Sequence, residues 1–164
     1  MNVYLIGLNA QDKNSDYGKM FYSDMNNSLQ LSEKLKFPNL EIQNKKIFSS
    51  LGPKYTLIDF WFSSCKPCLE QIPVYKKIYT KYKNDGFEII NISSDRTEDI
   101  SKWKKLITEK ELNWVHFLDE NGVLTRHYSI NKYPTSFLLD SEGKIIKKDS
   151  TPEELERFLK ENIQ

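Results

Sequence analysis

The most informative stretch of the sequence is 59-DFWFSSCKPCLEQIP-73, in which an apolar and aromatic run leads to two cysteines separated by Lys66 and Pro67. Cys65 and Cys68 are the only cysteines among the 164 residues. A single pair cannot build a disulfide framework or a four-thiolate zinc site. The C-x-x-C spacing therefore leaves three interpretations open: redox chemistry, half of a metal site, or coincidence.

The two cysteines are expected to differ in burial and in role. Cys65 stands where a strand gives way to a helix, and the free N–H groups and dipole of the first helical turn favour a thiolate there. Such a position can lower a cysteine pKa from ~8.5 into the range of ~3.5–7.5. Lys66 adds positive charge, and Pro67 suits the first turn and stiffens the dipeptide. We expect Cys65 to be the exposed attacking sulfur, and the more buried Cys68 to resolve the mixed disulfide.

Asp59 is a second candidate catalytic residue, because it interrupts the apolar stretch 56–62 where no solvent-seeking residue belongs. Burying an unpaired carboxylate is costly, so we expect the Asp59 pKa to be raised. A carboxyl of this kind behind Cys68 can take and return the proton that the thiol must lose. The alternative is an edge strand on which Asp59 points to water.

Two prolines add to the pattern. Pro73 removes one backbone hydrogen bond from the helix, but the amphipathic pattern continues to Tyr82, which favours a kinked helix over an early end. Pro134 precedes a buried strand, and X-Pro bonds adopt the cis form at low cost. From spacing alone, a trans proline at the start of a strand is the commoner case. A cis-proline loop facing the cysteines would leave backbone groups free to pair with an extended peptide.

Composition and charge argue against several classes of protein. The formal net charge is +1 and the basic residues are interspersed with acids, so we expect no nucleic-acid partner. No apolar run approaches the ~18 residues that a membrane span needs. The start, 1-MNVYLIGLNAQDKN-14, lacks the basic region of a signal peptide, although a mature chain would have lost its signal.

The pattern predicts a polar, Asn- and Ser-rich N-terminal extension over 1–36, with a short helix at 28–36, followed by one domain over 37–164. In that domain the expected strands are 40–42 and 46–48 as a hairpin, then 55–62, 87–93, 115–118, 135–139 and 145–148. The expected helices run from the cysteines to residue 83, over 97–110, over 123–128, and from a capping box of Thr151 and Glu154. This order predicts an α/β sandwich with a mixed sheet.

Taken together, these features resemble the thioredoxin superfamily, and within it the TlpA/ResA type of thiol-disulfide oxidoreductase found in Bacteroidetes. The resemblance covers 37–162 and rests on Asp59, the C-x-P-C pair, Pro73 and 133-YPTSFLLDSEGKII-146. It implies a thioredoxin-like three-layer α/β/α sandwich with an N-terminal hairpin and an extra strand and helix within 96–128. It also implies that Pro134 is cis and lies against the disulfide.

The resemblance further implies a redox enzyme whose active group is the Cys65–Cys68 disulfide, with no other cofactor and no metal. Its partners would be disulfide-containing proteins and an unidentified thiol electron donor. Its location would be periplasmic or otherwise extracytoplasmic, with membrane attachment only through a tether outside this chain. The residues expected to contact substrate are Trp61, Ser64, Lys66, Pro67, Tyr133 and Pro134.

Three positions depart from the family pattern. Ser64 replaces a tryptophan that usually precedes the first cysteine, which implies a more open site. Lys66 stands where glycine or glutamate is usual, which should stabilise the thiolate and make the disulfide more oxidising. Gln71 occupies a position where some members carry a glutamate, so any tuning by that acid is absent or moved.

Two other functions remain open at this point. A thioredoxin-like metallochaperone would bind Cu(I) or zinc through the cysteine pair and either His116 or His127. A thiol peroxidase would need an arginine and a threonine beside one activated cysteine. Arg96 and Arg126 are present, but no Thr/Pro arrangement precedes Cys65.

Overall fold

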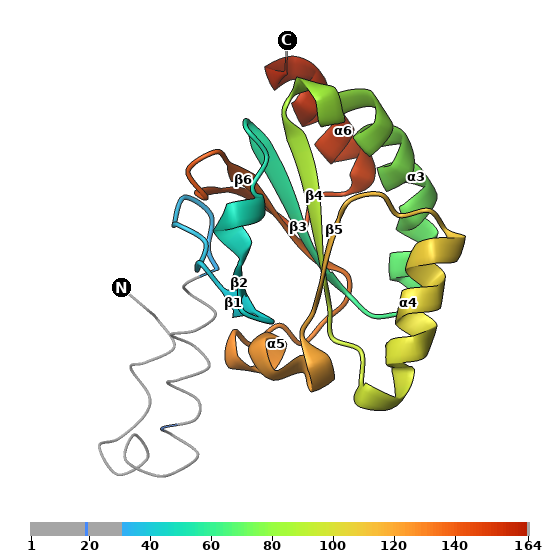
Figure 1. Cartoon of the computed structure of the whole chain (residues 1–164). Helices are drawn as coiled ribbons and strands as arrows, with labels where there is room; N and C mark the ends of the chain where they lie inside the picture. Colours follow the sequence, from blue (N-terminus) through green and yellow to red (C-terminus); the bar gives the residue numbers. More distant parts are fainter. Residues whose placement is uncertain (1–18, 20–30, 164) are drawn as a thin grey trace.

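The computed structural model describes residues 19 and 31–163, and its centre is a mixed sheet (Figure 1). Five strands of the described part pair in the order β5-β4-β3-β6-β7. Strands β3, β4 and β5 are parallel, whereas β6 and β7 are antiparallel to their neighbours. The strands are β3 (Tyr55–Trp61), β4 (Phe87–Ser93), β5 (Val115–Leu118), β6 (Thr135–Asp140) and β7 (Ile145–Lys148). This confirms the predicted mixed sheet, parallel at first and closed by an antiparallel hairpin.

Helices cover both faces of this sheet and make the three layers that the sequence predicted (Figure 1). One face packs against three helices, and the other against α5 and the hairpin β1–β2. The helices are α3 (Lys66–Tyr82), α4 (Ile100–Glu109), α5 (Val123–His127) and α6 (Pro152–Asn162). No described helix combines the length and apolar character that crossing a bilayer requires.

Strand β3 lies in the middle of the sheet, so the pleat alternates its side chains between two buried faces. Leu57 and Trp61 belong to the apolar cluster beneath α3, whereas Ile58 and Phe60 belong to the cluster on the opposite face. By the same alternation Asp59 points toward α3. A central strand apolar on both faces is what the sequence indicated.

Local signals set the ends of the helices on the α3 face. Thr151 and Glu154 form the predicted capping box, in which each backbone N–H donates to the other residue's side-chain oxygen, at 2.9 and 3.3 Å. Helix α3 continues through Pro73 to Tyr82, so the early end that a proline can cause does not occur. A kink at Pro73 stays a prediction.

The predicted hairpin is present but shorter than expected. Its strands are β1 (Glu41–Ile42) and β2 (Lys45–Lys46), and a 3₁₀ helix (Ile47–Ser50) follows where a strand was predicted to continue. The side chain of Ile47 is fully buried against the sheet, and the Ser49 hydroxyl donates to the Lys46 carbonyl. The chain forms a 3₁₀ turn here because this conformation buries Ile47 and satisfies the Lys46 carbonyl.

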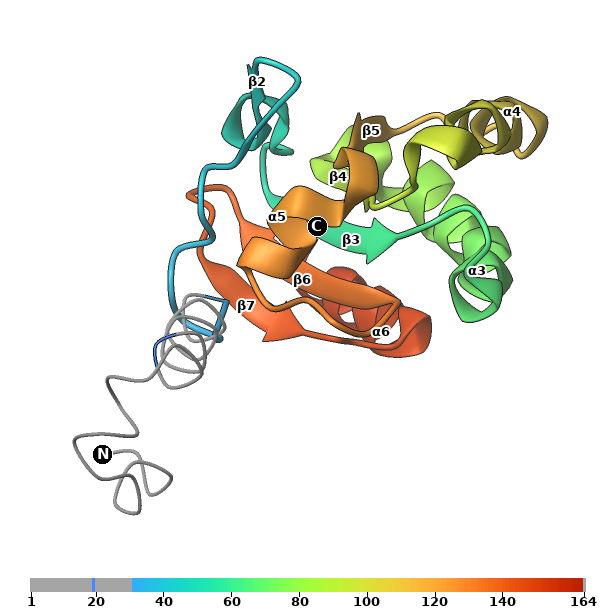
Figure 2. The ribbon, with the colours of Figure 1, turned by 90° about the horizontal axis from the view of Figure 1, so that it is seen from below.

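The short helix predicted over 28–36 is wrong for its described part. Residues 31–36 form turns, and this segment runs along the edge of β7 (Figure 2). The Lys34 N–H donates to the Ile145 carbonyl and the Ile145 N–H donates to Leu35, both at 2.8 Å. The open edge of β7 therefore takes the backbone groups that a helix would have used. Residues 28–30 lie outside the described part, and the division into 1–36 and 37–164 stays a prediction.

Candidate active site

Cys65 and Cys68 form a disulfide at the start of α3, with their Cα atoms 5.3 Å apart. Cys65 is the N-cap residue of the helix, and its Sγ accepts a hydrogen bond from the backbone N–H of Cys68 at 3.3 Å. The helix thus presents a free backbone donor to the first sulfur, as its predicted position required. This donor would stabilise negative charge on Cys65 once the disulfide is reduced.

The two sulfurs do not differ in burial as expected. Cys65 is 3% exposed and Cys68 is 4% exposed, so the prediction of an exposed Cys65 is wrong for this oxidised state. Phe62 and Tyr133 pack edge to face, 5.1 Å between ring centroids, against the cluster that contains both cysteines. Ser64 is itself exposed, but these two rings keep the site from being as open as the missing tryptophan implied.

A buried carboxylate that sequence reasoning missed holds the chain just before the cysteines. Asp95 accepts hydrogen bonds from the Ser63 backbone N–H at 3.0 and 3.1 Å, and from the Ser63 hydroxyl at 2.6 Å. The Ser93 hydroxyl donates to it as well. The Ser63 hydroxyl therefore faces Asp95, and Cys65 takes the cap position of α3. Asp95 stands two residues after the end of β4, but its partner Ser63 lies 32 residues earlier, so no local pattern connects the two.

Replacing Asp95 with alanine is expected to lower the free energy of unfolding by about 3 kcal/mol, because it leaves several buried donors without an acceptor. Urea denaturation followed by circular dichroism measures the change. Asp99→Ala is the matched control, since Asp99 lies nearby, is half-buried and makes no capping hydrogen bond. Equal stability of the two variants would contradict the role of Asp95 as an anchor.

Asp59 is buried in the sheet, on the face that carries the cysteines. It is 5% exposed and lies opposite Asn91 of β4 and Ser136 of β6. Its Oδ2 accepts a hydrogen bond from Asn91 Nδ2 at 2.7 Å, whereas its Oδ1 is buried without a partner among the described residues. Burial raises the pKa of Asp59 from 3.8 to about 7, and the Asn91 hydrogen bond acts in the opposite direction. The edge-strand alternative is therefore wrong.

Asn91 has a second partner, Trp114, and sequence reasoning missed both residues. The indole Nε1 of Trp114 donates to Asn91 Oδ1, so Asp59, Asn91 and Trp114 form one buried chain of hydrogen bonds. Asn91 could have been found by the signal that revealed Asp59, because it is a polar residue inside the apolar strand FEIINIS.

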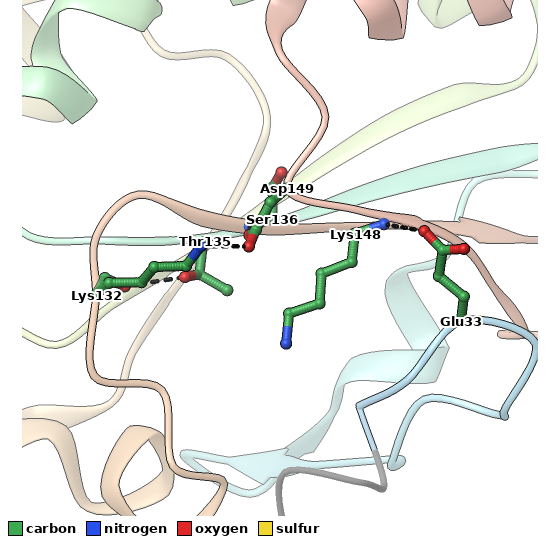
Figure 3. Close-up of polar contacts among 6 residues, drawn as sticks. All are labelled: Glu33, Lys132, Thr135, Ser136, Lys148 and Asp149. Carbon is green, nitrogen blue, oxygen red and sulfur yellow. Dashed lines mark hydrogen bonds and ion pairs between the residues drawn. The ribbon is translucent and has the colours of Figure 1, made fainter.

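The peptide bond before Pro134 is cis, as the family resemblance implied and spacing alone did not. Asp149 holds this loop from the neighbouring strand (Figure 3). One of its oxygens accepts from the Ser136 backbone N–H at 3.1 Å, and the other pairs with Lys132 Nζ at 2.7 Å. Pro134 also lines a small cavity with Gln71, so the loop lies against the side of α3.

A larger cavity, of about 370 Å³, opens next to the turn that carries the disulfide and brings two candidate substrate residues together, Ser64 and Tyr133. The exposed Lys102 of α4 donates to the Ser64 hydroxyl at 2.7 Å at its edge. The lining residues are Phe62, Ser64, Ser94, Asp95, Arg96, Asp99 and Tyr133.

The four other candidate substrate residues lie outside the lining of this cavity, and one of them, Pro134, lines the smaller cavity beside α3. Lys66 and Pro67 are exposed on the first turn of α3. Trp61 is only 2% exposed, and its contact with substrate stays a prediction. It shares a strand face with Asp59 and packs into the core.

The metallochaperone alternative needs a histidine beside the sulfurs. His116 instead stacks on Trp114, and its Nε2 lies 3.1 Å from the Leu112 carbonyl oxygen. Burial lowers the His116 pKa to about 4. Over the described ranges, no three histidine, cysteine, aspartate or glutamate side chains gather as a metal site would require.

Comparisons with known proteins agree with this geometry. A family model described as thioredoxin-like matches residues 52–145. A protein named thiol-disulfide oxidoreductase ResA from Bacillus thuringiensis is 36% identical over 124 residues, which cover 73% of this chain and 70% of that protein. A protein of the same name from Bacillus cereus is 32% identical over 143 residues, covering 85% and 82%.

Solved structures show the same relationship. The thioredoxin domain of a thiol-disulfide oxidoreductase from Bacteroides vulgatus aligns with a TM-score of 0.67 and 28% identity, covering 82% of this chain and 99% of that one. A thiol:disulfide interchange protein from a Bacteroides species aligns with a TM-score of 0.68 and 30% identity, covering 82% and 91%. With its Cys65–Cys68 pair at the start of α3, the chain belongs to the thioredoxin-like family and is a thiol-disulfide oxidoreductase.

Proposed function

We propose that this oxidoreductase works as a reductase of disulfides in other proteins. The observation that carries the proposal is the Cys65 sulfur at the N-cap of α3, where it accepts a hydrogen bond from the Cys68 N–H. The first attack needs a thiolate, and this position favours one. The protein-disulfide class of substrate and the direction of electron flow are both part of the proposal.

The proposed reaction transfers two electrons in two exchanges. In the reduced enzyme the Cys65 thiolate attacks one sulfur of the substrate disulfide, forms a mixed disulfide and releases one substrate thiolate. The Cys68 thiolate then attacks the Cys65 sulfur and releases the second substrate thiolate. The substrate leaves as a dithiol and the enzyme as the disulfide. A dithiol electron donor restores the reduced form by the reverse exchanges.

Asp59 is the proposed acceptor of the proton that the Cys68 thiol loses before the second exchange. Asp59 lies on the α3 face of the sheet, between Leu57 and Trp61, which pack in the same apolar cluster as Cys68. Its pKa of about 7 suits a proton acceptor that works near neutrality. Because Cys68 is buried and other bases cannot reach it, its proton needs an acceptor nearby. On return of the electrons, the same carboxyl gives the proton back.

The proposed substrate contacts surround the disulfide. Ser64 and Tyr133 line the adjoining cavity, and Lys66 and Pro67 form the exposed first turn. An extended peptide segment of the substrate could pair with the backbone beside the cis Pro134. The same family resemblance supports an extracytoplasmic location.

The midpoint potential tests the direction of the proposed reaction. Equilibration with glutathione buffers should give a value well below about −180 mV, in the range of disulfide reductants. Alkylation of free thiols followed by mass spectrometry measures the reduced fraction. A midpoint near about −120 mV, which is typical of a strong oxidant, would overturn the reductase assignment.

A further inference from the structure

We propose that Trp114 is a positioning residue for the redox reaction, because it orients the side-chain amide of Asn91 so that Asn91 always donates to Asp59. The proposal rests on the role of Asp59 given above as proton acceptor. It extends the site by two residues, Asn91 on β4 and Trp114 immediately before β5, neither of which the cysteine motif reveals.

The register of the parallel strands places the residues of this hydrogen-bond chain next to one another. Asp59 and Asn91 are paired across β3 and β4, so their side chains rise side by side toward α3. Trp114 stands immediately before β5, the next strand of the sheet. All three are buried, with 5%, 4% and 8% of their surface exposed.

The direction of the hydrogen bonds follows from what each group can do. An indole N–H is only a donor, so Trp114 Nε1 requires the oxygen of the Asn91 amide. The amide NH₂ group must then face Asp59, where it donates at 2.7 Å. A flipped amide would place two donors against each other in a buried site. Trp114 therefore removes the orientation in which Asn91 would favour a protonated Asp59.

The indole ring is itself clamped. Tyr79 of α3 packs edge-on against Trp114 with 5.6 Å between ring centroids. His116 of β5 stacks on it at 6.0 Å. The hydroxyl of Tyr79 lies 3.4 Å from a carboxyl oxygen of Glu88. These contacts hold the indole N–H in line with Asn91.

The other titratable groups around Asp59, Asn91 and Trp114 either stay neutral over the pH range in which Asp59 titrates or lie further away. Burial raises the pKa of Tyr75, which faces Asp59 from α3, so this phenol stays protonated. Burial lowers the pKa of His116 to about 4, which leaves its ring neutral near pH 7. Ser136 of β6 does not titrate.

More distant charges belong to Asp149, Lys132, Glu153 and Glu88. Asp149 pairs with Lys132 at the Pro134 loop, and both Asp149 and Glu153 act on Tyr75. Glu88 contacts the Tyr79 hydroxyl and accepts the Ile89 backbone N–H.

The test compares two tryptophan variants of the oxidised protein. Trp114→Phe removes the indole N–H and keeps an aromatic ring. Trp103→Phe is the matched control, since Trp103 is also 8% exposed in the same cluster but its Nε1 has no partner in the described structure. Carboxyl ¹³C NMR of aspartate-labelled protein follows the titration of Asp59. We expect its pKa to rise by about one unit in Trp114→Phe, as loss of a fixed donor to a carboxylate predicts, and to stay unchanged in Trp103→Phe.

A measurement on the unmodified protein keeps the test decisive if Trp114→Phe does not fold. The chain has three tryptophans, so its indole N–H groups give three NMR signals. The Trp114 signal should shift with the midpoint of Asp59, and Asp59→Asn should abolish that shift while leaving the Trp103 signal unchanged.

Either of two results would overturn the positioning role: an unchanged pKa of Asp59 in folded Trp114→Phe, or a Trp114 N–H signal that does not shift as Asp59 titrates. Failure of the proton-acceptor role would look different. In that case the titration shifts would occur, but the pH–rate profile of disulfide reduction would be the same in Asp59→Asn and the unmodified protein.

Discussion

Replacing Cys65 with alanine is expected to lower the rate of insulin disulfide reduction by roughly a thousandfold or more, because the attacking sulfur is gone. No second thiol occupies the N-cap position, since Cys68 is the one other cysteine in the chain and lies one turn into α3. A turbidity assay of insulin reduction, with dithiothreitol as electron donor and corrected for the uncatalysed rate, measures the loss.

Cys68→Ala is the matched control for this variant. Both variants lose the same disulfide and one sulfur, so any loss of stability is shared between them. They differ in chemistry, because Cys68→Ala keeps the attacking sulfur and lacks the resolving one. It should therefore trap a stoichiometric mixed disulfide with substrate, visible by mass spectrometry, whereas Cys65→Ala should trap none. Trapping by Cys65→Ala would show that the two roles are assigned the wrong way round.

Much of the fold could be predicted because local signals and burial agree along most of the domain. Strand β3 is rich in aromatic and β-branched residues and is preceded by a Gly-Pro turn, so its range was predicted to within one residue. The cap of α6 likewise depends on Thr151 and Glu154 alone. Signals of this kind are contained within a few residues and need no tertiary information.

The errors in the fold arise where a distant segment supplies the partner. The segment 31–36 has a weak helical pattern, but the open edge of β7 binds its backbone through Ile145. The 3₁₀ helix at Ile47–Ser50 depends on the fit of Ile47 against the sheet. Neither partner lies close enough in sequence for a local pattern to show it.

The active site divides in the same way. Cys65, Cys68 and Asp59 could be identified because their residue types conflict with an apolar surrounding. Asp95 and Trp114 could not be placed, since their roles depend on which strand ends meet in space. Strand alternation puts Trp61 on the same buried face as Asp59, which could also be predicted from the sequence.

Asp59→Asn is expected to slow disulfide reduction about a hundredfold at pH 7, which is within the usual effect of losing a general base. The same change should stabilise the protein at and above neutral pH. The folded-state pKa of about 7 exceeds the ordinary 3.8, so the native protein binds a proton that the unfolded chain has released between these values. The stability that the protonated Asp59 contributes to the unmodified protein is therefore fully present at low pH and is lost as the pH rises from about 4 to 7.

The asparagine side chain carries no charge at any pH and avoids this loss. The variant should gain on the order of 4 kcal/mol over the unmodified protein above pH 7, with the difference vanishing toward pH 4. Urea denaturation across this pH range measures the gain, and a stopped-flow assay measures the rate. Asp85→Asn is the control, because Asp85 is exposed in the turn after α3 and outside the lining of the disulfide cavity, so both profiles should stay unchanged. A variant that is slower but shows no pH-dependent gain would mean that Asp59 is charged throughout and does not act as the proton acceptor.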